Sequence, residues 1–257
     1  MDLGLIGKVA LVTGGSRGLG RAICIGLAAE GANVSINYYK ADCTEEARAV
    51  ELAKLLEAQY GIKAAVVGGD VSLECDVDTI VNTTIQEFGQ LDVLVNNAGI
   101  WPTAYIKDMR KADWDRTLNI NLTGPFMLCQ RMLCHLLETK RRGKIVNIVS
   151  QAAFHGSTSG HAHYASAKAG LVTLTISLAR EAAPYGINVN AVAPGMMRTE
   201  MSQEALADRE GAYVERIPIG RVAEPEEVAH VVVFLASNKA DYLTGTTIDA
   251  TGGMLMR

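Results

Sequence analysis

The stretch VTGGSRGLG, residues 12–20, ends the apolar run KVALVT and leads into a helical pattern that begins at residue 18. Gly14 permits a tight turn, Gly18 lets the backbone approach a pyrophosphate, and Gly20 lets a helix pack closely on the sheet. The N-terminus of that helix presents free backbone N–H groups and a partial positive charge to phosphate oxygens. The stretch therefore predicts the strand, turn and helix that open a doubly wound α/β fold and bind a dinucleotide.

Apolar runs alternate with helical patterns along the rest of the chain. The runs are nearly continuous in Val, Ile and Leu, which is typical of parallel strands covered by helices on both faces. They are KVALVT, NVSINY, KAAVVGG, LDVLVNN, GKIVNIVS, INVNAVAP and GTTIDATGG. Helical patterns occupy residues 18–30, 44–60, 74–88, 111–140, 162–184 and 225–237. We expect one doubly wound domain that spans residues 1–257.

The alternation is interrupted at residues 196–224, between Gly195 and Pro225. An insertion at the carboxyl end of a parallel strand is a common position for a segment that covers the substrate. An ordinary surface excursion with a helix of its own explains the segment equally well.

Composition argues against several kinds of partner and site. The formal net charge of −4 and the sequence pI of about 5.8 offer no basic surface for nucleic acid or an anionic membrane. No apolar run reaches the roughly 18 residues that span a bilayer, and the N-terminus lacks a signal-peptide pattern, so we expect a cytoplasmic protein. Five cysteines form no CxxC pair, and Cys129, Cys134 and His135 scatter around a helix, so no metal is expected.

The end of the second strand bears on the choice of cofactor. An NAD site has an acidic residue about 20 positions after the glycine-rich turn, where it binds the ribose hydroxyls. Here that strand ends INYYK, residues 36–40, without a carboxylate. Arg17 and Lys40 are instead placed to bind a 2′-phosphate. We therefore expect NADP(H) rather than NAD(H); the alternative is that Arg17 is only a solvated loop residue and that Tyr38 merely flanks the adenine.

Two further strand ends should meet at the edge of the sheet where doubly wound folds bind ligands. GGDVS, residues 68–72, ends the third strand, and VNNAGI, residues 95–100, ends the fourth. Asp70 is placed to accept a hydrogen bond from an adenine amino group. Asn97, Ala98 and Gly99 are placed to bring the backbone close to the cofactor.

An ordered set of motifs covers essentially the whole chain. The motifs are TGxxxGxG at 13–20, NNAG at 96–99, NINLTG at 119–124, a strand ending in Ser150, YxxxK at 164–168 and APG at 193–195. Their order resembles that of the short-chain dehydrogenase/reductase family. The resemblance implies a seven-stranded parallel Rossmann sheet, an NAD(P)-dependent interconversion of a carbonyl and a secondary alcohol, and a homotetramer. It assigns the catalytic roles to Asn121, Ser150, Tyr164 and Lys168.

Position in the fold and this resemblance together assign the cofactor site. Its residues are Gly14, Ser16, Arg17, Gly18, Leu19, Gly20, Tyr38, Asp70, Val71, Asn97, Ala98, Gly99, Tyr164, Lys168, Pro194, Gly195 and Thr199. By the resemblance, Thr199 lies near the nicotinamide carboxamide. Asn121 is chosen within NINLTG because the family's asparagine stands three residues before a glycine, here Gly124, and Asn119 is the alternative.

Tyr164 and Lys168 stand four residues apart and so share one face of a helix. With an unperturbed pKa of about 10, tyrosine is a poor base at neutral pH. An ammonium about 4 Å away, at an effective dielectric near 20, lowers the phenol pKa by about 3 units. This predicts a general acid/base with a pKa near neutrality, while Ser150 donates a hydrogen bond to the substrate oxygen. By the resemblance, Asn121 holds a water that links Lys168 to solvent.

Members of the family act on substrates as different as sugars, steroids and oxoacyl thioesters. Here the substrate, a small carbonyl or alcohol, is expected near Trp101, Gln151, His155, Met196 and Met197. His161 and His163 have no role that Tyr164 leaves open. They are expected at a polar loop edge, with contact to substrate as the alternative.

The chain also resembles the 3-oxoacyl-acyl-carrier-protein reductases, which dock their carrier on basic surface. Arg141 matches one docking position, whereas Tyr185 occupies the other, and the segment between Ser150 and Tyr164 is one residue longer. These departures weaken the carrier-protein hypothesis, which stays an alternative. A non-catalytic dinucleotide-binding protein is a second alternative.

Helix 111–140 carries more apolar residues than a single buried stripe requires. They are Leu118, Leu122, Phe126, Met127, Leu128, Met132, Leu133, Leu136 and Leu137. Contact with another subunit is favoured over complete burial within the chain.

Overall fold

Seven strands form one continuous sheet in the computed structural model, which describes residues 2–157 and 159–256. They are β1 (Val9–Val12), β2 (Asn33–Tyr38), β3 (Ala64–Gly68), β4 (Val93–Asn96), β5 (Gly143–Ile148), β6 (Ile187–Pro194) and β7 (Thr247–Ala250). The order across the sheet is β3-β2-β1-β4-β5-β6-β7, and every neighbouring pair is parallel. The predicted seven-stranded, doubly wound Rossmann sheet is confirmed.

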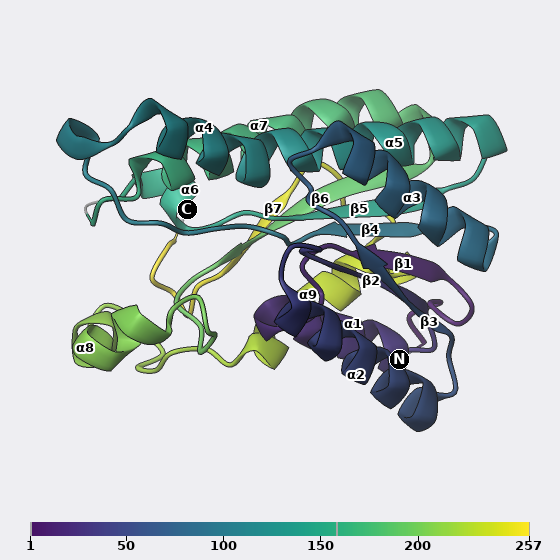
Figure 1. Ribbon diagram of the computed structural model, residues 1–257, viewed down its shortest axis with the longest axis horizontal. Coiled ribbons are helices and arrows are strands. Elements are labelled where there is room, and N and C mark those ends of the chain that lie inside the picture. Colours follow the sequence, from purple (N-terminus) through teal and green to yellow (C-terminus); the bar gives the residue numbers. More distant parts are fainter. Residues whose placement is uncertain (1, 158, 257) are drawn as a thin grey trace.

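Helices cover both faces of this sheet (Figure 1). The longer ones are α1 (Gly18–Ala29), α2 (Cys43–Tyr60), α3 (Glu74–Phe88), α4 (Lys111–Leu118), α5 (Gly124–Thr139), α7 (Ala162–Ala182), α8 (Gln203–Val214) and α9 (Pro225–Ala236). A four-residue helix, α6 (Ala152–His155), and 3₁₀ turns at Ile106–Asp108, Ala183–Tyr185 and Asn238–Ala240 complete the set. In the figure α3, α4, α5 and α7 lie above the sheet, and α1, α2 and α9 lie below it.

Two apolar cores, one on each face, explain the continuous apolar runs. In β1, Ala10 and Val12 belong to the core beneath α1, α2 and α9, whereas Val9 and Leu11 belong to the core beneath α3, α5 and α7. Because successive side chains of a strand point to opposite faces, each position of a central strand has to be apolar. Burial of the strands on both faces stabilises the sheet and thereby defines the edge at which the carboxyl ends of the strands meet.

The predicted helix 111–140 is divided by a π-helical turn at Asn119–Thr123. Pro125 lies in the first turn of α5, and proline lacks the backbone N–H that would continue an α-helical ladder. The widened turn buries Asn121, whose side chain donates a hydrogen bond to the carbonyl oxygen of Thr117. π turns of this kind occur often at functional sites.

Residues 196–224 form a small structural unit beside the sheet, with α8 at its centre (Figure 1). Leu206, Ile217 and Val222 are its buried apolar residues, and Tyr213 packs against them. The segment is therefore built around an apolar cluster of its own.

None of the described helices is long and apolar enough to cross a bilayer. Within residues 2–157 and 159–256, no group of three His, Cys, Asp or Glu side chains is arranged to hold a metal ion.

Candidate active site

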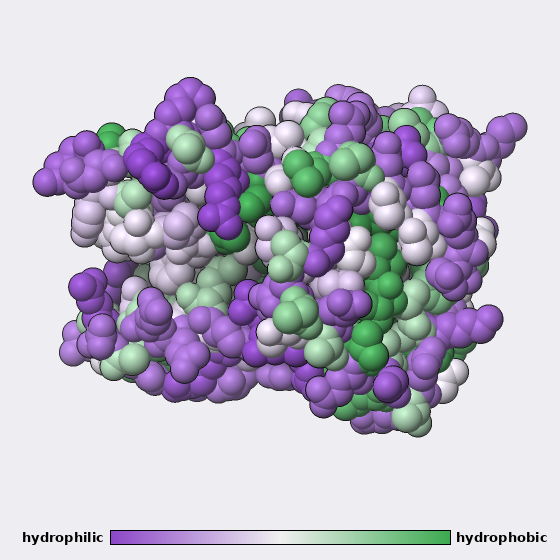
Figure 2. All heavy atoms as spheres, in the orientation of Figure 1, coloured by the Kyte–Doolittle hydropathy of each residue, from purple (hydrophilic) through white to green (hydrophobic). Residues whose placement is uncertain are grey.

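A cavity of about 630 Å³ opens at the carboxyl ends of the strands. Its wall is formed by residues that directly follow β1, β3, β4, β5 and β6, together with parts of α7 and of residues 196–224. The surface is hollowed on the same side of the molecule, between α8 and the helices across the sheet (Figure 2). This volume falls in the usual range of cofactor and substrate sites, about 300–1,000 Å³.

The glycine-rich turn forms one part of the wall. Gly18 has φ of +49°, a conformation that side chains rarely adopt. A Cβ atom on Gly20 would overlap the carbonyl oxygen of Gly14, so α1 can approach the turn this closely only with glycine there. The turn thereby leaves the N-terminus of α1 open to the cavity.

The turn after β1 is joined to the turn after β4. The hydroxyl oxygen of Thr13 accepts hydrogen bonds from the backbone N–H groups of Asn97 and Ala98, each at 3.0 Å. The Asn97 side chain in turn donates to the carbonyl oxygens of Thr13 at 2.9 Å and Gly14 at 3.0 Å. The two loops therefore form one rigid unit beneath the cavity.

Tyr164 and Lys168 lie on the first turns of α7, beside Ser150 at the end of β5. The Tyr164 and Ser150 side chains share a hydrogen bond. The Lys168 ammonium donates to the carbonyl oxygen of Ile148 at 2.8 Å and lies 5.7 Å from the centre of the Tyr164 ring. Lys168 is only 3% exposed, so a cation is held at the buried end of the cavity.

Burial controls the proton affinities of this pair. It raises the pKa of Tyr164 to about 12, against the opposing effect of the Ser150 hydrogen bond. It also lowers the pKa of Lys168 to about 8. The sequence-based expectation of a phenol pKa near neutrality is therefore wrong. Desolvation outweighs the attraction between phenolate and ammonium, and the ammonium is directed at the Ile148 carbonyl group.

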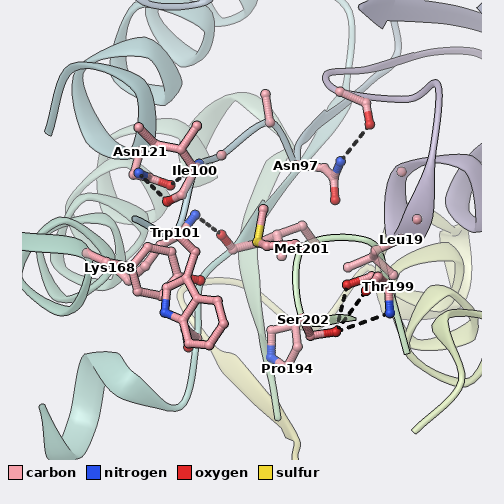
Figure 3. A pocket seen from close by; sticks show the side chains of 18 of the residues that line it. Leu19, Asn97, Ile100, Trp101, Asn121, Lys168, Pro194, Thr199, Met201 and Ser202 are labelled. Atoms are coloured by element: carbon pink, nitrogen blue, oxygen red, sulfur yellow. Dashed lines mark hydrogen bonds between the residues drawn. The ribbon is translucent and has the colours of Figure 1, made fainter. Parts of the chain in front are cut away.

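Asn121 lines the cavity, whereas Asn119 is exposed and outside the wall. The Asn121 side-chain oxygen accepts a hydrogen bond from the Ile100 N–H at 3.3 Å, and its amide donates to the Ile100 carbonyl oxygen at 3.1 Å (Figure 3). A Cβ on Gly99 would lie 2.7 Å from the Asn121 oxygen and 3.8 Å from the Lys168 nitrogen. Asn121 and Lys168 therefore flank the same short stretch of backbone.

The part of the cavity where substrate is expected has aromatic and sulfur-containing side chains. Every residue expected there lines it, namely Trp101, Gln151, His155, Met196 and Met197. The Trp101 ring stacks on His161, with centroids 4.3 Å apart, and the His161 Nδ1 atom lies 2.8 Å from the Pro102 carbonyl oxygen. This contact fixes the mouth of the site beside the start of α7.

The expectation that His161 and His163 lie at a polar loop edge is wrong, because both are buried. His161 precedes α7 and contributes to the cavity wall. His163 lies outside the wall, and burial lowers its pKa, although the Asp113 carboxylate opposes the shift. The first turn of α7 packs inward, which a sequence of alternating polar and small residues does not reveal.

Residues 196–224 supply several lining residues without a sequence signal. Met201, Tyr213 and Arg216 line the cavity beside the expected Thr199. The Thr199 N–H donates to the Ser202 hydroxyl at 3.2 Å (Figure 3). These side chains come from turns and from the end of α8, where no hydrophobic period marks them.

The part of the cavity expected to bind adenosine departs from expectation at Tyr38. This side chain is buried in the core beneath α1 and α2 and does not line the cavity, whereas Tyr39 does. The cause is the alternation of side chains along β2, in which Tyr38 shares a face with Val34 and Ile36.

Lys40 is also outside the wall of the cavity, because its ammonium pairs with the carboxylate of Asp76 at 2.6 Å.

Arg17 does line the cavity, and its guanidinium lies 3.0 Å from the carboxylate of Glu45. Glu45 and Asp42, near the start of α2, are lining residues that the sequence interpretation missed. Charged residues in the first turn of a helix are usually solvated, so nothing in their spacing indicated a site.

Apart from Tyr38, every residue assigned to the cofactor from sequence lines this one cavity, together with Asn121 and Ser150. A glycine-rich turn and a Ser, Tyr and Lys group thus share a site at the carboxyl edge of a doubly wound sheet. This combination defines a dinucleotide-dependent oxidoreductase.

Comparison with known proteins gives the family. A family model described as enoyl-(acyl carrier protein) reductase matches residues 14–255. A 3-oxoacyl-[acyl-carrier-protein] reductase of Aquifex aeolicus is 41% identical over 254 residues, 99% of this chain and 100% of that protein. The enzyme of the same name from Synechocystis is 39% identical over 253 residues, 98% of each chain. The chain belongs to the short-chain dehydrogenase/reductase family of NAD(P)-dependent oxidoreductases.

A solved structure agrees with this placement. A protein of Agrobacterium tumefaciens, described provisionally as a gluconate dehydrogenase, superposes with a TM-score of 0.90 and 36% identity. The match covers 98% of both chains. The chain thus resembles proteins named for different substrates.

Proposed function

We propose that the protein is an NADP(H)-dependent carbonyl reductase in which Tyr164 donates the proton to the substrate oxygen. The observation that carries this proposal is the position of Tyr164, Lys168 and Ser150 in the same cavity as the glycine-rich turn. A hydride donor and a proton donor bound at one site are what reduction of a carbonyl requires.

The cavity fits a dinucleotide. Gly18 lets the backbone approach a pyrophosphate at the N-terminus of α1, and Gly20 lets the helix pack closely against the glycine-rich turn. Asp70 and Val71 would hold the adenine, and Pro194, Gly195 and Thr199 the nicotinamide side. When bound, the nicotinamide supplies or accepts the hydride.

Tyr164 is suited to act as an acid at neutral pH. With a pKa of about 12 it is fully protonated, and an alkoxide is a stronger base than a phenolate, so transfer to the reduced oxygen is favourable. Ser150 donates a hydrogen bond to that oxygen as negative charge develops. Lys168, with a pKa of about 8, is mostly protonated at pH 7 and stabilises the phenolate that remains.

Asn121 completes the proton path in this proposal. Its side-chain oxygen lies close to Gly99 and hence to the ammonium of Lys168. It would hold a water that returns a proton from solvent to Tyr164 by way of Lys168. Asn121 is favoured over Asn119 for this role because Asn119 is outside the cavity wall.

The preference for NADP(H) rests on Arg17. Its side chain is 51% exposed at the adenosine end, where a planar guanidinium suits a 2′-phosphate. No carboxylate ends β2, where NAD-specific relatives of this fold bind the ribose hydroxyls. We expect NADPH to bind more tightly than NADH, which a fluorescence titration would measure.

We propose a small carbonyl compound, or the corresponding secondary alcohol, as the substrate. Trp101, Met196, Met201 and Tyr213 give the substrate end a largely apolar wall that suits a carbon skeleton. Residues 196–224 would cover this end, because Met196, Met201 and Tyr213 belong to that segment.

The 3-oxoacyl-acyl-carrier-protein reductase activity of the named relatives is the second candidate. Two observations disfavour docking of a carrier on this chain. Arg141 donates hydrogen bonds to Gln90 and to the buried carboxylate of Asp92, both at 2.8 Å, which engages its charge within the fold. Tyr185, at the other docking position, is exposed and carries no charge.

One panel separates these candidates. Consumption of NADPH is followed with ketones, keto sugar acids, and the same 3-oxoacyl thioester on a small thiol, on coenzyme A and on acyl carrier protein. We expect turnover of free carbonyls and no preference for the carrier-linked thioester. A kcat/KM at least about tenfold higher on the carrier would establish the second candidate. Absence of turnover with both cofactors across the panel would contradict an enzyme of either kind.

We also propose a homotetramer in the cytoplasm. Phe126 and Leu137 on α5 and Ile176 on α7 are exposed large apolar side chains on neighbouring helices, as an interface between subunits requires. All five cysteines are free thiols, which is typical of a reducing compartment. Sedimentation as a monomer would contradict the tetramer.

A further inference from the structure

A buried carboxylate lies at the adenosine end of the cavity. Glu45, in the first turn of α2, is 7% exposed and lines the wall. The Ser16 hydroxyl donates a hydrogen bond to it. Two guanidinium groups contact the same carboxylate, Arg17 through Nε at 3.0 Å and Arg48 through Nη1 at 3.4 Å. Glu45 therefore holds the cation that the proposed function assigns to a 2′-phosphate.

The charged side chains around Arg17 and Glu45 do not favour the binding of a phosphate. Among the described lining residues between 14 and 72, Arg17 is the only lysine or arginine, whereas Asp42, Glu45 and Asp70 are carboxylates. Lys40, which could have added positive charge, is paired with Asp76 outside the wall. A 2′-phosphate would therefore gain Arg17 only by displacing Glu45 or by lying close to its negative charge.

We propose that Glu45 sets the cofactor selectivity of this enzyme by competing with the 2′-phosphate for Arg17. The inference rests on the proposed role of Arg17. Binding of a 2′-phosphate has to overcome both the loss of the Arg17–Glu45 pair and repulsion from the carboxylate. A 2′-hydroxyl meets neither cost and finds an acceptor in the nearby Asp42 carboxylate. Glu45 thus narrows the preference for NADP(H) and allows NAD(H) to bind.

Glu45→Gln tests this competition directly, because it keeps the shape of the side chain and an acceptor oxygen for Ser16 but removes the charge. Calorimetry with adenosine 2′,5′-bisphosphate and with AMP isolates the 2′-phosphate from catalysis. We expect the bisphosphate to bind about fivefold to tenfold more tightly to the variant, and AMP to change by less than about twofold. NADPH and NADH should follow the same pattern.

Glu46→Gln is the matched control, since Glu46 is exposed in the same helical turn and the substitution removes the same charge. It should leave both ligands within about twofold, because an exposed charge is screened by solvent. Equal tightening in the two variants would overturn the assignment to Glu45. So would unchanged or weaker binding of the bisphosphate to a folded Glu45→Gln protein.

Arg17→Gln separates this inference from the proposed function. If it leaves bisphosphate binding unchanged, the assignment of Arg17 to the 2′-phosphate fails. If it weakens binding while Glu45→Gln has no effect, only the role of Glu45 fails. The double variant should lose the gain seen in Glu45→Gln.

Arg48→Gln provides a test on the surface if Glu45→Gln does not fold. Arg48 offsets part of the Glu45 charge without lining the cavity, so its loss leaves more negative potential for the 2′-phosphate. The bisphosphate should bind about twofold to threefold more weakly, with AMP unchanged. An unchanged ratio of the two affinities would count against the competition.

Discussion

The two ends of the cavity treat charge in opposite ways. At the proposed adenosine end, Arg17 pairs with Glu45, and half of the arginine side chain is open to solvent. At the proposed nicotinamide end, Lys168 is buried and Tyr164 is partly buried, and desolvation moves their pKa values to about 8 and about 12. Solvent reaches the arginine of the first pair, whereas desolvation dominates the second pair. A charge is therefore suited to selecting between cofactors at one end and to controlling a proton at the other.

The most severe test of the buried end is Tyr164→Phe. Loss of the only proposed proton donor should lower kcat by about 10³-fold to 10⁴-fold. The ring remains, so NADPH affinity should stay within about twofold. Steady-state kinetics and a binding titration measure the two effects. Tyr185→Phe, at an exposed site outside the cavity, should behave as wild type; comparable turnover in the two variants would refute the mechanism.

Ser150→Ala should have the next largest effect. Its hydroxyl is proposed to bind the developing oxyanion, so kcat should fall by about 10²-fold. The hydrogen bond from Ser150 also lowers the pKa of Tyr164, so its loss should move the pH dependence of alcohol oxidation to higher pH. Ser166→Ala, exposed on the same helix as Tyr164, is the control. An unshifted pH profile would show that Ser150 does not influence the pKa of the Tyr164 phenol.

The pH dependence should differ between the two directions of reaction. Oxidation of an alcohol needs the Tyr164 phenolate, so its rate should rise with pH by up to about tenfold per unit below the phenol pKa of about 12. Reduction needs the protonated phenol and the Lys168 ammonium, so it should be level near neutrality and decline as pH passes about 8. Initial rates in both directions measure this. A flat profile for oxidation would contradict the assignment of Tyr164.

Double burial is the reason that the fold could be predicted. A strand such as VALV in β1 has to be apolar at every position, and the glycines at 14, 18 and 20 mark the turn that follows it. Most of the site followed, because its residues stand at strand ends that a parallel sheet brings together.

The sequence-based expectations failed where the burial or the direction of a single side chain decides whether it lines the cavity and what its pKa is. Tyr38 and Tyr39 are adjacent, and only the register of β2 shows which one reaches the cavity. The Tyr164 pKa depends on desolvation, which no spacing of residues reveals. From sequence alone, Glu45 is expected to be a solvated residue of a helix, and only the fold shows that Arg17 lies beside it.

Lys40→Gln should have the smallest effect on cofactor binding. It tests whether Arg17, and not Lys40, is the cation that binds the 2′-phosphate. The sequence placed Lys40 and Arg17 equally well for a 2′-phosphate, but the Lys40 ammonium is bound to Asp76 and lies outside the cavity wall. Its loss should change NADPH affinity by less than about twofold, whereas Arg17→Gln should weaken it by about tenfold. Titration of both variants with NADPH measures the difference. Equal weakening would mean that Lys40 leaves Asp76 to bind the cofactor, and that the ion pairs at this end rearrange on binding.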